Sequence, residues 1–174
     1  LIAIEPIRKR YYKLKAVAEM MGAEIIQPRL MDARRYRDDN LFDRVLLDAP
    51  CSSEGRIRTF DKKSYQYWNL RKIKEMRRKQ KGLIFNAGCL LKPGGTLVYA
   101  TCTFAPEENE EVIDWFLRKT ENAFTVDPIS PETIGSYPAL EAWQGKGYDP
   151  RLKGCLRVLP DGVWSAFFIA KLKR

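Results

Sequence analysis

The chain has 174 residues, 45% of them hydrophobic, which fits one globular domain with a real core. Its 31 lysines and arginines against 22 aspartates and glutamates give a net charge of +9, which favours polyanionic partners such as nucleic acid. The sequence has no histidine, which excludes zinc sites with histidine ligands and hydrolases that depend on an imidazole base.

The four cysteines, Cys51, Cys89, Cys102 and Cys155, are far apart and form no CxxC pair, so we expect free thiols and no metal site. No apolar run approaches the roughly 18 residues that a membrane-spanning helix needs, so we expect a cytoplasmic protein without a membrane partner. The chain begins at Leu1 inside a strand pattern. We therefore expect the N-terminally incomplete part of a longer domain.

Short apolar runs alternate with helical patterns in the first part of the chain. Leu1–Glu5 is typical of a buried strand, and the apolar spacing of Arg8–Met21 predicts a helix that Gly22 closes. Ala23–Gln27 is expected as a second strand, followed by a loop that holds Asp32. This alternation indicates a parallel α/β sheet.

The middle of the chain continues the same pattern. Phe42–Asp48 predicts a third strand, and Ser53–Tyr67 is expected as a long functional loop. Tyr67–Leu91 predicts a helix, Leu91–Gly95 a turn, and Thr96–Thr101 a fourth strand. One side of the helix is apolar, and the other is basic, which indicates either a solvated face or an RNA-binding face. The expected buried side is Ile73, Met76, Gln80, Leu83, Ile84, Ala87 and Leu91, and the basic side is Arg71, Lys72, Lys74, Arg77, Arg78, Lys79 and Lys81.

The last part is less regular. A helix is predicted from Pro106 onward, with acidic residues in its first turn and Val112, Ile113, Phe116 and Leu117 as its core stripe. Residues 122–153 are expected as a long irregular crossing. The segments 155–160 and 165–174 are expected to pair as an antiparallel edge hairpin across the turn 161–164.

Three acids follow predicted strands: Glu5, Asp32 and Asp48. In an open α/β sheet the ligand crevice lies beyond the carboxyl ends of the strands, so these acids could line one pocket. Glu5 could accept hydrogen bonds from ribose hydroxyls, Asp32 from an adenine amine, and Asp48 could face the reacting centre. The alternative is that each acid only caps the following turn or helix.

Two cysteines, Cys51 and Cys102, also follow predicted strands. A single cysteine in such a place is more often a small buried apolar residue. Two of them at the rim that holds the acids fit a reaction in which a thiolate adds to an activated ring and leaves again. Cys102 stands just before a predicted helix, whose N-terminus would favour the thiolate.

The segments VLLDAPCSSEGRIR (45–58) and LKPGGTLVYATCTFAPEENEEVIDWFL (91–117), with Trp68 and Gln80 between them, resemble one family closely. It is the Sun/Fmu (Nop2-type) family of S-adenosylmethionine-dependent RNA cytosine-5 methyltransferases, and a weaker match continues along essentially the whole chain. The resemblance implies a Rossmann-like class I methyltransferase fold. Its α/β sheet would be mostly parallel, with an antiparallel C-terminal hairpin and without its first strand.

The resemblance also implies roles for individual residues. Cys102 would be the nucleophile that adds to carbon 6 of the cytosine, and Cys51 the second cysteine, which is needed to release the product. Asp48 would bind the pyrimidine edge beside the methyl end of S-adenosylmethionine. Glu5 would bind the ribose and Asp32 the adenine of that cofactor, and Arg8 matches a frequent arginine of the same segment.

We therefore predict that residues 1–174 are a methyltransferase catalytic domain, N-terminally incomplete, that methylates carbon 5 of an unpaired or flipped-out cytosine in tRNA or rRNA. Its partners would be RNA and S-adenosylmethionine, without metal. The sequence shows no GxGxxG or P-loop to cradle a nucleotide. The alternative hypothesis is a truncated RNA-binding fragment without catalytic activity.

Overall fold

The structure is a computed structural model that describes residues 1–130, 135–161 and 164–174. The chain consists of two compact units, Leu1–Asp39 and Asn40–Arg174. The first unit contains β1 (Ile2–Ile4), α1 (Arg8–Met20), β2 (Gln27–Arg29) and the 3-10 turn η1 (Ala33–Arg35). Strands β1 and β2 are parallel, as predicted, with Ile2 opposite Gln27.

The predicted start of the second strand at Ala23 is wrong, because β2 begins at Gln27. Gly22 has a φ of 63°, and the Ala23 N–H donates to Ala18 O at 2.8 Å, which closes the end of α1. The Ile26 N–H then donates back to Ala23 O at 3.1 Å. Residues 23–26, which were predicted as the start of a strand, therefore form turns.

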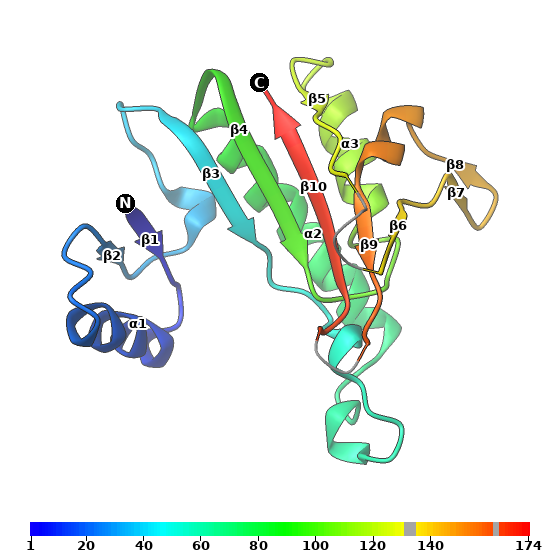
Figure 1. Cartoon of the computed structure of the whole chain (residues 1–174), viewed down its shortest axis with the longest axis horizontal. Coiled ribbons are helices and arrows are strands. Elements are labelled where there is room, and N and C mark those ends of the chain that lie inside the picture. Colours follow the sequence, from blue (N-terminus) through cyan, green and yellow to red (C-terminus); the bar gives the residue numbers. More distant parts are fainter. Residues whose placement is uncertain (131–134, 162–163) are drawn as a thin grey trace. The chain divides into compact units, whose positions relative to one another are not determined.

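The second unit is built on a six-stranded sheet, shown in Figure 1. Its order is β3-β4-β10-β9-β6, and β5 also pairs with β10. Only β3 and β4 pair in parallel among the described strands of this sheet, and the other pairs are antiparallel. The strands are β3 (Phe42–Asp48), β4 (Leu91–Thr101), β5 (Thr125–Val126), β6 (Ser136–Pro138), β9 (Leu156–Val158) and β10 (Phe167–Lys173).

The α/β class is confirmed, but the C-terminal hairpin is not at the edge of the sheet. Strand β10 lies between β4 and β9, and β9 pairs on its other side with β6. The predicted irregular crossing therefore supplies an edge strand, since β6 lies within it. Residues 131–134 of that crossing and 162–163 of the predicted hairpin turn lie outside the described residues.

The remainder of the crossing also forms short elements in its described part. A small hairpin joins β7 (Ala142–Trp143) to β8 (Lys146–Gly147), and η4 (Pro150–Gly154) follows it. The predicted turn at Leu91–Gly95 is likewise part of β4, where Gly94 has a φ of 76° and its N–H donates to Arg174 O.

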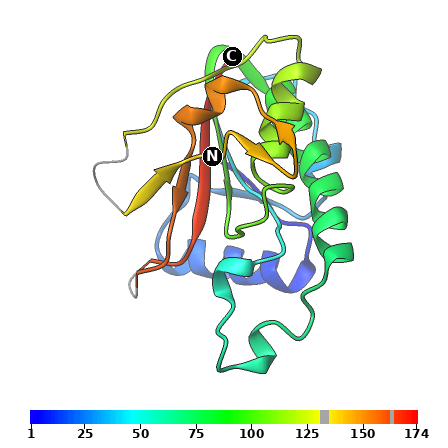
Figure 2. The same ribbon diagram turned by 90° about the vertical axis from the view of Figure 1, so that its right-hand side faces the viewer.

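Helices α2 (Leu70–Cys89) and α3 (Glu110–Lys119) lie on one face of this sheet, as Figure 2 shows. The Asn69 side chain caps α2 by accepting from the Lys72 N–H at 2.8 Å. A Cβ on Gly88 would lie 2.8 Å from the Phe116 ring, so glycine lets the two helices approach. The predicted buried side of α2 is buried, although the predicted helix extended too far and its last residue, Leu91, is the first residue of β4. The predicted core stripe of α3 is buried as well.

Helix α3 begins at Glu110, later than the predicted start at Pro106. The intervening residues form turns, with the Glu108 N–H donating to Ala105 O at 3.0 Å. Glu108 and Asn109 are fully buried. Their side chains bond to the buried Gln80 side chain and to Thr103 O, so they do not form an exposed first turn of the helix. Among the described residues, no helix combines the length and the hydropathy of a membrane-spanning segment.

Candidate active site

Cys51 and Cys102 lie side by side. Strands β3 and β4 are parallel neighbours, with Asp48 opposite Ala100, so their carboxyl ends meet at one edge of the sheet. Each cysteine follows one of these ends, and their Sγ atoms are 3.2 Å apart. Both are half-buried free thiols. The structure thus brings together the two cysteines that the sequence separates.

The pKa values of the two thiols are shifted in opposite directions. The hydrogen bond between them raises the pKa of Cys51, and burial raises it further. The same hydrogen bond is the main cause that lowers the pKa of Cys102 to about 6, helped by Ser53 and Arg56 and opposed by burial and Asp48. The shared hydrogen bond therefore favours the thiolate on Cys102 and the proton on Cys51. Such a pair has one nucleophile and one proton-bearing neighbour.

A buried glutamate holds the loop that carries Cys51. Glu108 Oε2 accepts from the Ser52 N–H at 3.0 Å and from Gln80 Nε2 at 2.7 Å. Gln80 Nε2 also donates to Pro50 O at 2.8 Å. Burial raises the pKa of Glu108, against these hydrogen bonds. Helix α2 and the turn before α3 thus fix the backbone on both sides of Cys51.

A second glutamate, Glu54, holds the loop that carries Cys102. Its Oε2 accepts from Thr103 Oγ1 at 3.0 Å and from the Phe104 N–H at 3.1 Å, and its Oε1 accepts from Trp68 Nε1 at 2.8 Å. Thr103 Oγ1 also lies 2.7 Å from Ser52 Oγ. The two cysteine loops are therefore joined by hydrogen bonds as well as by the sulfur contact.

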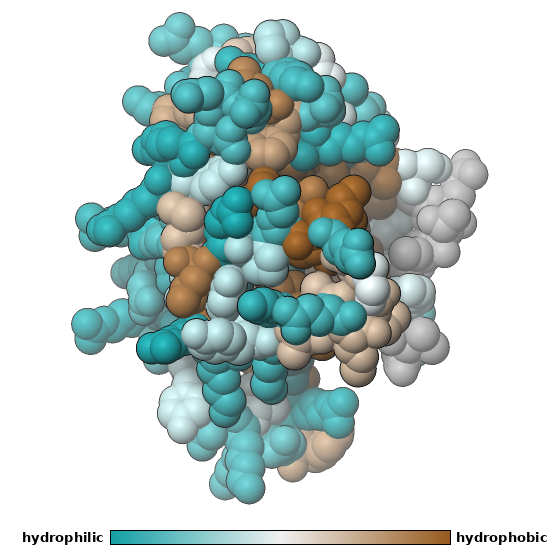
Figure 3. Space-filling model, turned by 90° about the vertical axis from the view of Figure 1, so that its left-hand side faces the viewer, coloured by the Kyte–Doolittle hydropathy of each residue, from teal (hydrophilic) through white to brown (hydrophobic). Residues whose placement is uncertain are grey.

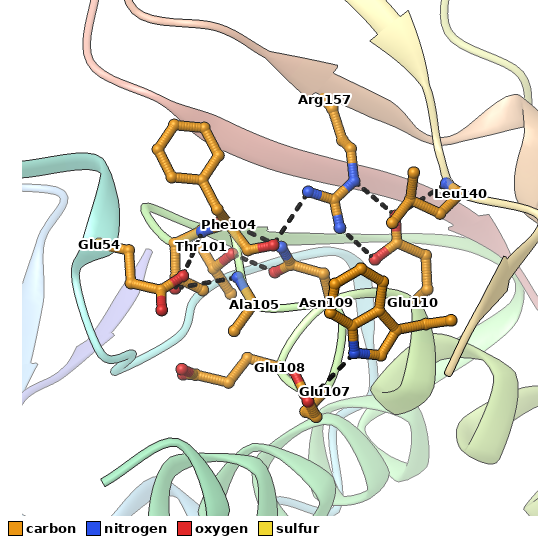
Figure 4. Close-up of polar contacts among 12 residues, drawn as sticks. Glu54, Thr101, Phe104, Ala105, Glu107, Glu108, Asn109, Glu110, Leu140 and Arg157 are labelled. Carbon is orange, nitrogen blue, oxygen red and sulfur yellow. Dashed lines mark hydrogen bonds and ion pairs between the residues drawn. The ribbon is translucent and has the colours of Figure 1, made fainter. Parts of the chain in front are cut away.

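A buried ion pair supports the same loop from the other side, as Figure 4 shows. Arg157 Nε and Nη2 donate to the two carboxylate oxygens of Glu110, at 2.7 and 2.6 Å. Arg157 Nη1 donates to Phe104 O at 3.0 Å, and Asn109 Nδ2 donates to Thr103 O at 3.0 Å. The Glu110 side chain is 0% exposed. Strand β9 and helix α3 thereby anchor the residues after Cys102.

Gly55 shows how closely the long loop approaches Cys102. Its N–H donates to Cys102 O at 3.0 Å, and a Cβ built on it would lie 2.7 Å from Ala166 Cβ. Only glycine fits this place without a shift of the neighbouring backbone. Beyond it lies an open cavity of about 540 Å³, lined by Glu54, Ile57, Thr59, Tyr65, Trp68 and Phe104.

The predicted acids divide between the two units. Asp48 lies near the thiols, where its charge raises the pKa of Cys102. Glu5 and Asp32 belong to the first unit, where they follow the parallel strands β1 and β2. The common pocket for all three acids stays a prediction.

The acids of the first unit already have local partners. Glu5 Oε1 accepts from the Ile7 N–H at 2.9 Å, and its Oε2 pairs with Arg10 at 3.0 Å. Asp32 caps η1 and pairs closely with Arg34, as the capping alternative expects. The Arg8 guanidinium lies 5.8 Å from the centre of the Tyr12 ring.

The basic side of α2 is not uniformly solvated. Arg77 and Lys81 both pair with Glu111 of α3, at 2.9 and 3.4 Å, and Lys146 lies 3.9 Å from the same carboxylate.

Among the residues that the structure describes, no cluster of three or more Cys, Asp or Glu side chains could hold a metal ion.

The comparisons with known proteins agree on one family. The family model described as 16S rRNA methyltransferase RsmB/F matches residues 1–173. A tRNA (cytosine(49)-C(5))-methyltransferase of Pyrococcus abyssi is 40% identical, over the whole of this chain and 55% of that protein.

Two solved structures from Pyrococcus horikoshii are similar. A methyltransferase homologue has 29% identity and a TM-score of 0.82, over 99% of this chain and 52% of that one. NSun6 with SFG has 30% identity and a TM-score of 0.77, over 99% of this chain and 40% of that one. The chain thus spans about half the length of these relatives or less. The predicted resemblance is confirmed: the chain belongs to the 16S rRNA methyltransferase RsmB/F family.

Proposed function

We propose that residues 1–174 are part of the catalytic domain of an S-adenosylmethionine-dependent enzyme that methylates carbon 5 of a cytosine in tRNA or rRNA. The observation that carries this proposal is the pair of thiols 3.2 Å apart, of which Cys102 has a pKa lowered to about 6. The family description names an rRNA methyltransferase, and the name of the Pyrococcus abyssi relative gives carbon 5 of a tRNA cytosine.

In the proposed reaction the Cys102 thiolate adds to carbon 6 of the cytosine. The electron pair of the carbon 5–carbon 6 double bond makes carbon 5 nucleophilic, while Asp48 binds the polar edge of the ring. S-adenosylmethionine supplies the methyl group that carbon 5 accepts. The base must be unpaired or flipped out to reach the thiol.

Cys51 then acts in product release. Once Cys102 is bound to carbon, it no longer holds the charge and hydrogen bond that raise the pKa of Cys51. Cys51 loses its proton to solvent, and its thiolate takes the proton from carbon 5. The electrons of that carbon–hydrogen bond restore the double bond, and Cys102 leaves carbon 6 with the carbon–sulfur electron pair.

The acceptor groups of the first unit fit a cofactor role to different degrees. Glu5 Oε1 accepts one hydrogen bond here and Oε2 is ion-paired with Arg10, which leaves lone pairs for a ribose diol. The Asp32 oxygens already accept from Arg34, so Asp32 would bind an adenine amine only by giving up part of that contact.

Variants of the two cysteines test the proposed roles. Cys102→Ala should abolish methyl transfer to RNA, whereas Cys51→Ala should accumulate a covalent protein–RNA adduct that survives a denaturing gel. Cys89→Ala, at an exposed thiol at the end of α2, is the control and should behave like the unaltered chain. Methyl transfer by Cys102→Ala at the normal rate would show that the roles are wrong.

Calorimetric titration tests the cofactor separately. Binding of S-adenosylmethionine to the chain, weakened in Glu5→Gln, supports the proposal. Binding of unpaired RNA by a chain that gives no heat with the cofactor would favour the alternative hypothesis of a non-catalytic RNA-binding fragment.

A further inference from the structure

We propose that the open cavity beside Cys102 is a stacking site for a second unpaired nucleobase, the neighbour of the target cytosine in the RNA strand. This inference rests on the proposed function, since it assumes a single-stranded RNA substrate at Cys102. It adds a substrate-binding subsite formed mainly by Phe104, Trp68 and Tyr65.

The place of the cavity separates it from the reacting base. Neither cysteine lines it, and Asp48 does not line it either. Phe104 does line it and lies two residues after Cys102, a distance of at most about 7 Å along extended backbone. A base in the cavity would therefore lie beside the base that Cys102 attacks, as the next nucleotide of an unstacked strand does.

The cavity is lined by aromatic rings more than by free polar groups. Phe104, Trp68 and Tyr65 stay 37%, 43% and 37% exposed, although large aromatic side chains are usually buried more fully. Glu54 directs both its oxygens to protein donors, since they accept from Trp68, Thr103 and the Phe104 N–H. Such walls favour stacking, which tolerates any base, over recognition of one base edge.

The surrounding charges favour RNA over a protein partner. Arg56, Arg58, Lys62 and Lys63 belong to the same loop and are exposed. None of the four forms an ion pair with a residue that the structure describes. At the lower end of the surface in Figure 3, hydrophilic side chains alternate with paler and brown apolar ones. Cations interspersed with aromatic rings are typical of sites for single-stranded nucleic acid.

The cavity is also linked to the nucleophile. The indole N–H of Trp68 donates to Glu54, and Glu54 holds Thr103 and Phe104 next to Cys102. A base that stacks on Trp68 would thus steady the loop that carries the thiolate. Trp68 and Glu54 would act as positioning residues, so we expect their replacement to raise KM more than it lowers kcat.

The test uses the full chain and a single-stranded oligoribonucleotide with one cytosine, without cofactor. In one series, the base on the 5′ or the 3′ side of the cytosine is removed to leave an abasic sugar. Loss of a stacked base should weaken binding by roughly 5- to 150-fold on one of the two sides. Phe104→Leu and Trp68→Leu should weaken binding of the intact strand by a similar factor.

The decisive measurement combines the two changes. If the missing base and the missing ring belong to one contact, the abasic strand should bind Phe104→Leu no more weakly than it binds the unaltered chain. Trp68→Phe, which keeps a ring but loses the hydrogen bond to Glu54, should recover most of the affinity. Tyr137→Leu, at an exposed aromatic residue of β6 outside the cavity, should bind normally.

Three results would overturn the proposal. The first is an unchanged affinity for both abasic strands. The second is a loss from the abasic strand that is as large in Phe104→Leu as in the unaltered chain. The third is a dimer of the chain that Trp68→Leu dissociates while RNA affinity stays the same, since the cavity would then bind a second copy. If the abasic effect is seen but Cys102→Ala still methylates normally, the subsite stands and the proposed cysteine roles fail.

Discussion

The two loops that carry the cysteines and the loop between Ile57 and Trp68 are built in opposite ways. The cysteine loops bind groups from distant elements: Gln80 and Glu108, both 0% exposed, hold the Cys51 loop. Arg157 holds the Cys102 loop through Phe104 O and is itself paired with the buried Glu110. The intervening loop holds itself by short-range contacts, such as those of Ser64 with Arg58 and Asp61. A fixed distance between two sulfurs needs a rigid support, whereas a surface that meets a flexible strand gains from the freedom to adjust.

The largest expected effect tests the rigid side of this comparison. Arg157→Met leaves the Glu110 carboxylate buried without its counterion and removes a donor to Phe104 O. We expect the free energy of unfolding to fall by about 3–5 kcal/mol in urea denaturation.

Lys153→Met is the matched control for Arg157→Met. Lys153 pairs with Glu141 at 2.9 Å, but both side chains are more than half exposed. This change should cost less than about 1 kcal/mol. Equal losses for the two variants would mean that the buried pair supports the site no more than a surface pair does.

The next effect concerns Glu108. Glu108→Ala leaves the Ser52 N–H and Gln80 Nε2 without their shared acceptor in a buried place. An unsatisfied buried donor costs about 1–3 kcal/mol, so urea denaturation should show a loss of that size. The variant should also alkylate faster at Cys51, because the loop that buries this thiol is no longer held. An unchanged alkylation rate would show that Gln80 alone fixes the loop through Pro50.

These residues also mark what the sequence could predict. The strand Phe42–Asp48 was predicted correctly from a short apolar run, and the buried side of α2 from the helical period of its apolar residues. A buried role for Gln80 could be suspected from the sequence, since Gln80 is a polar residue on an apolar helix face. Nothing in the sequence indicates the buried roles of Glu108 and Glu110, because acids near a helix start are usually exposed.

The partners of these acids explain why pattern alone does not find them. Glu108 bonds to Gln80 and Glu110 to Arg157, residues that are 28 and 47 positions away in the chain. The same limit applies to the hairpin, whose place in the sheet depends on the pairing of β9 with β6. That the two cysteines lie at one rim was predictable from a rule of topology, because the carboxyl ends of parallel strands lie at one edge of the sheet. The contact of their sulfur atoms was not predicted.

The third expected effect is on the pH dependence of Cys102 alkylation. The pKa of Cys102 is lowered to about 6, so its thiolate is present above that pH and is lost below it. The rate of alkylation by iodoacetamide should rise about tenfold from pH 5 to a plateau above pH 7, following the thiolate fraction.

Cys51→Ala supplies the control for this pH profile. It removes the hydrogen bond that contributes most to the lowered pKa of Cys102. The midpoint should therefore move upward, and alkylation should still increase above pH 7. The measurement is made in a Cys89→Ala background, so that the exposed thiol of α2 does not react. An identical midpoint in both proteins would show that the second thiol does not activate the first.

The smallest expected effect tests the adjustable side. Phe60 is 85% exposed in the loop between Ile57 and Trp68, and it does not line the cavity beside Cys102. Phe60→Ser should change the free energy of unfolding by no more than about 0.5 kcal/mol, because little packing is lost. The same urea denaturation that detects Arg157→Met measures it. A loss above about 1 kcal/mol would mean that this loop is packed as firmly as the cysteine loops, and that the aromatic residues exposed there serve the fold before they serve RNA.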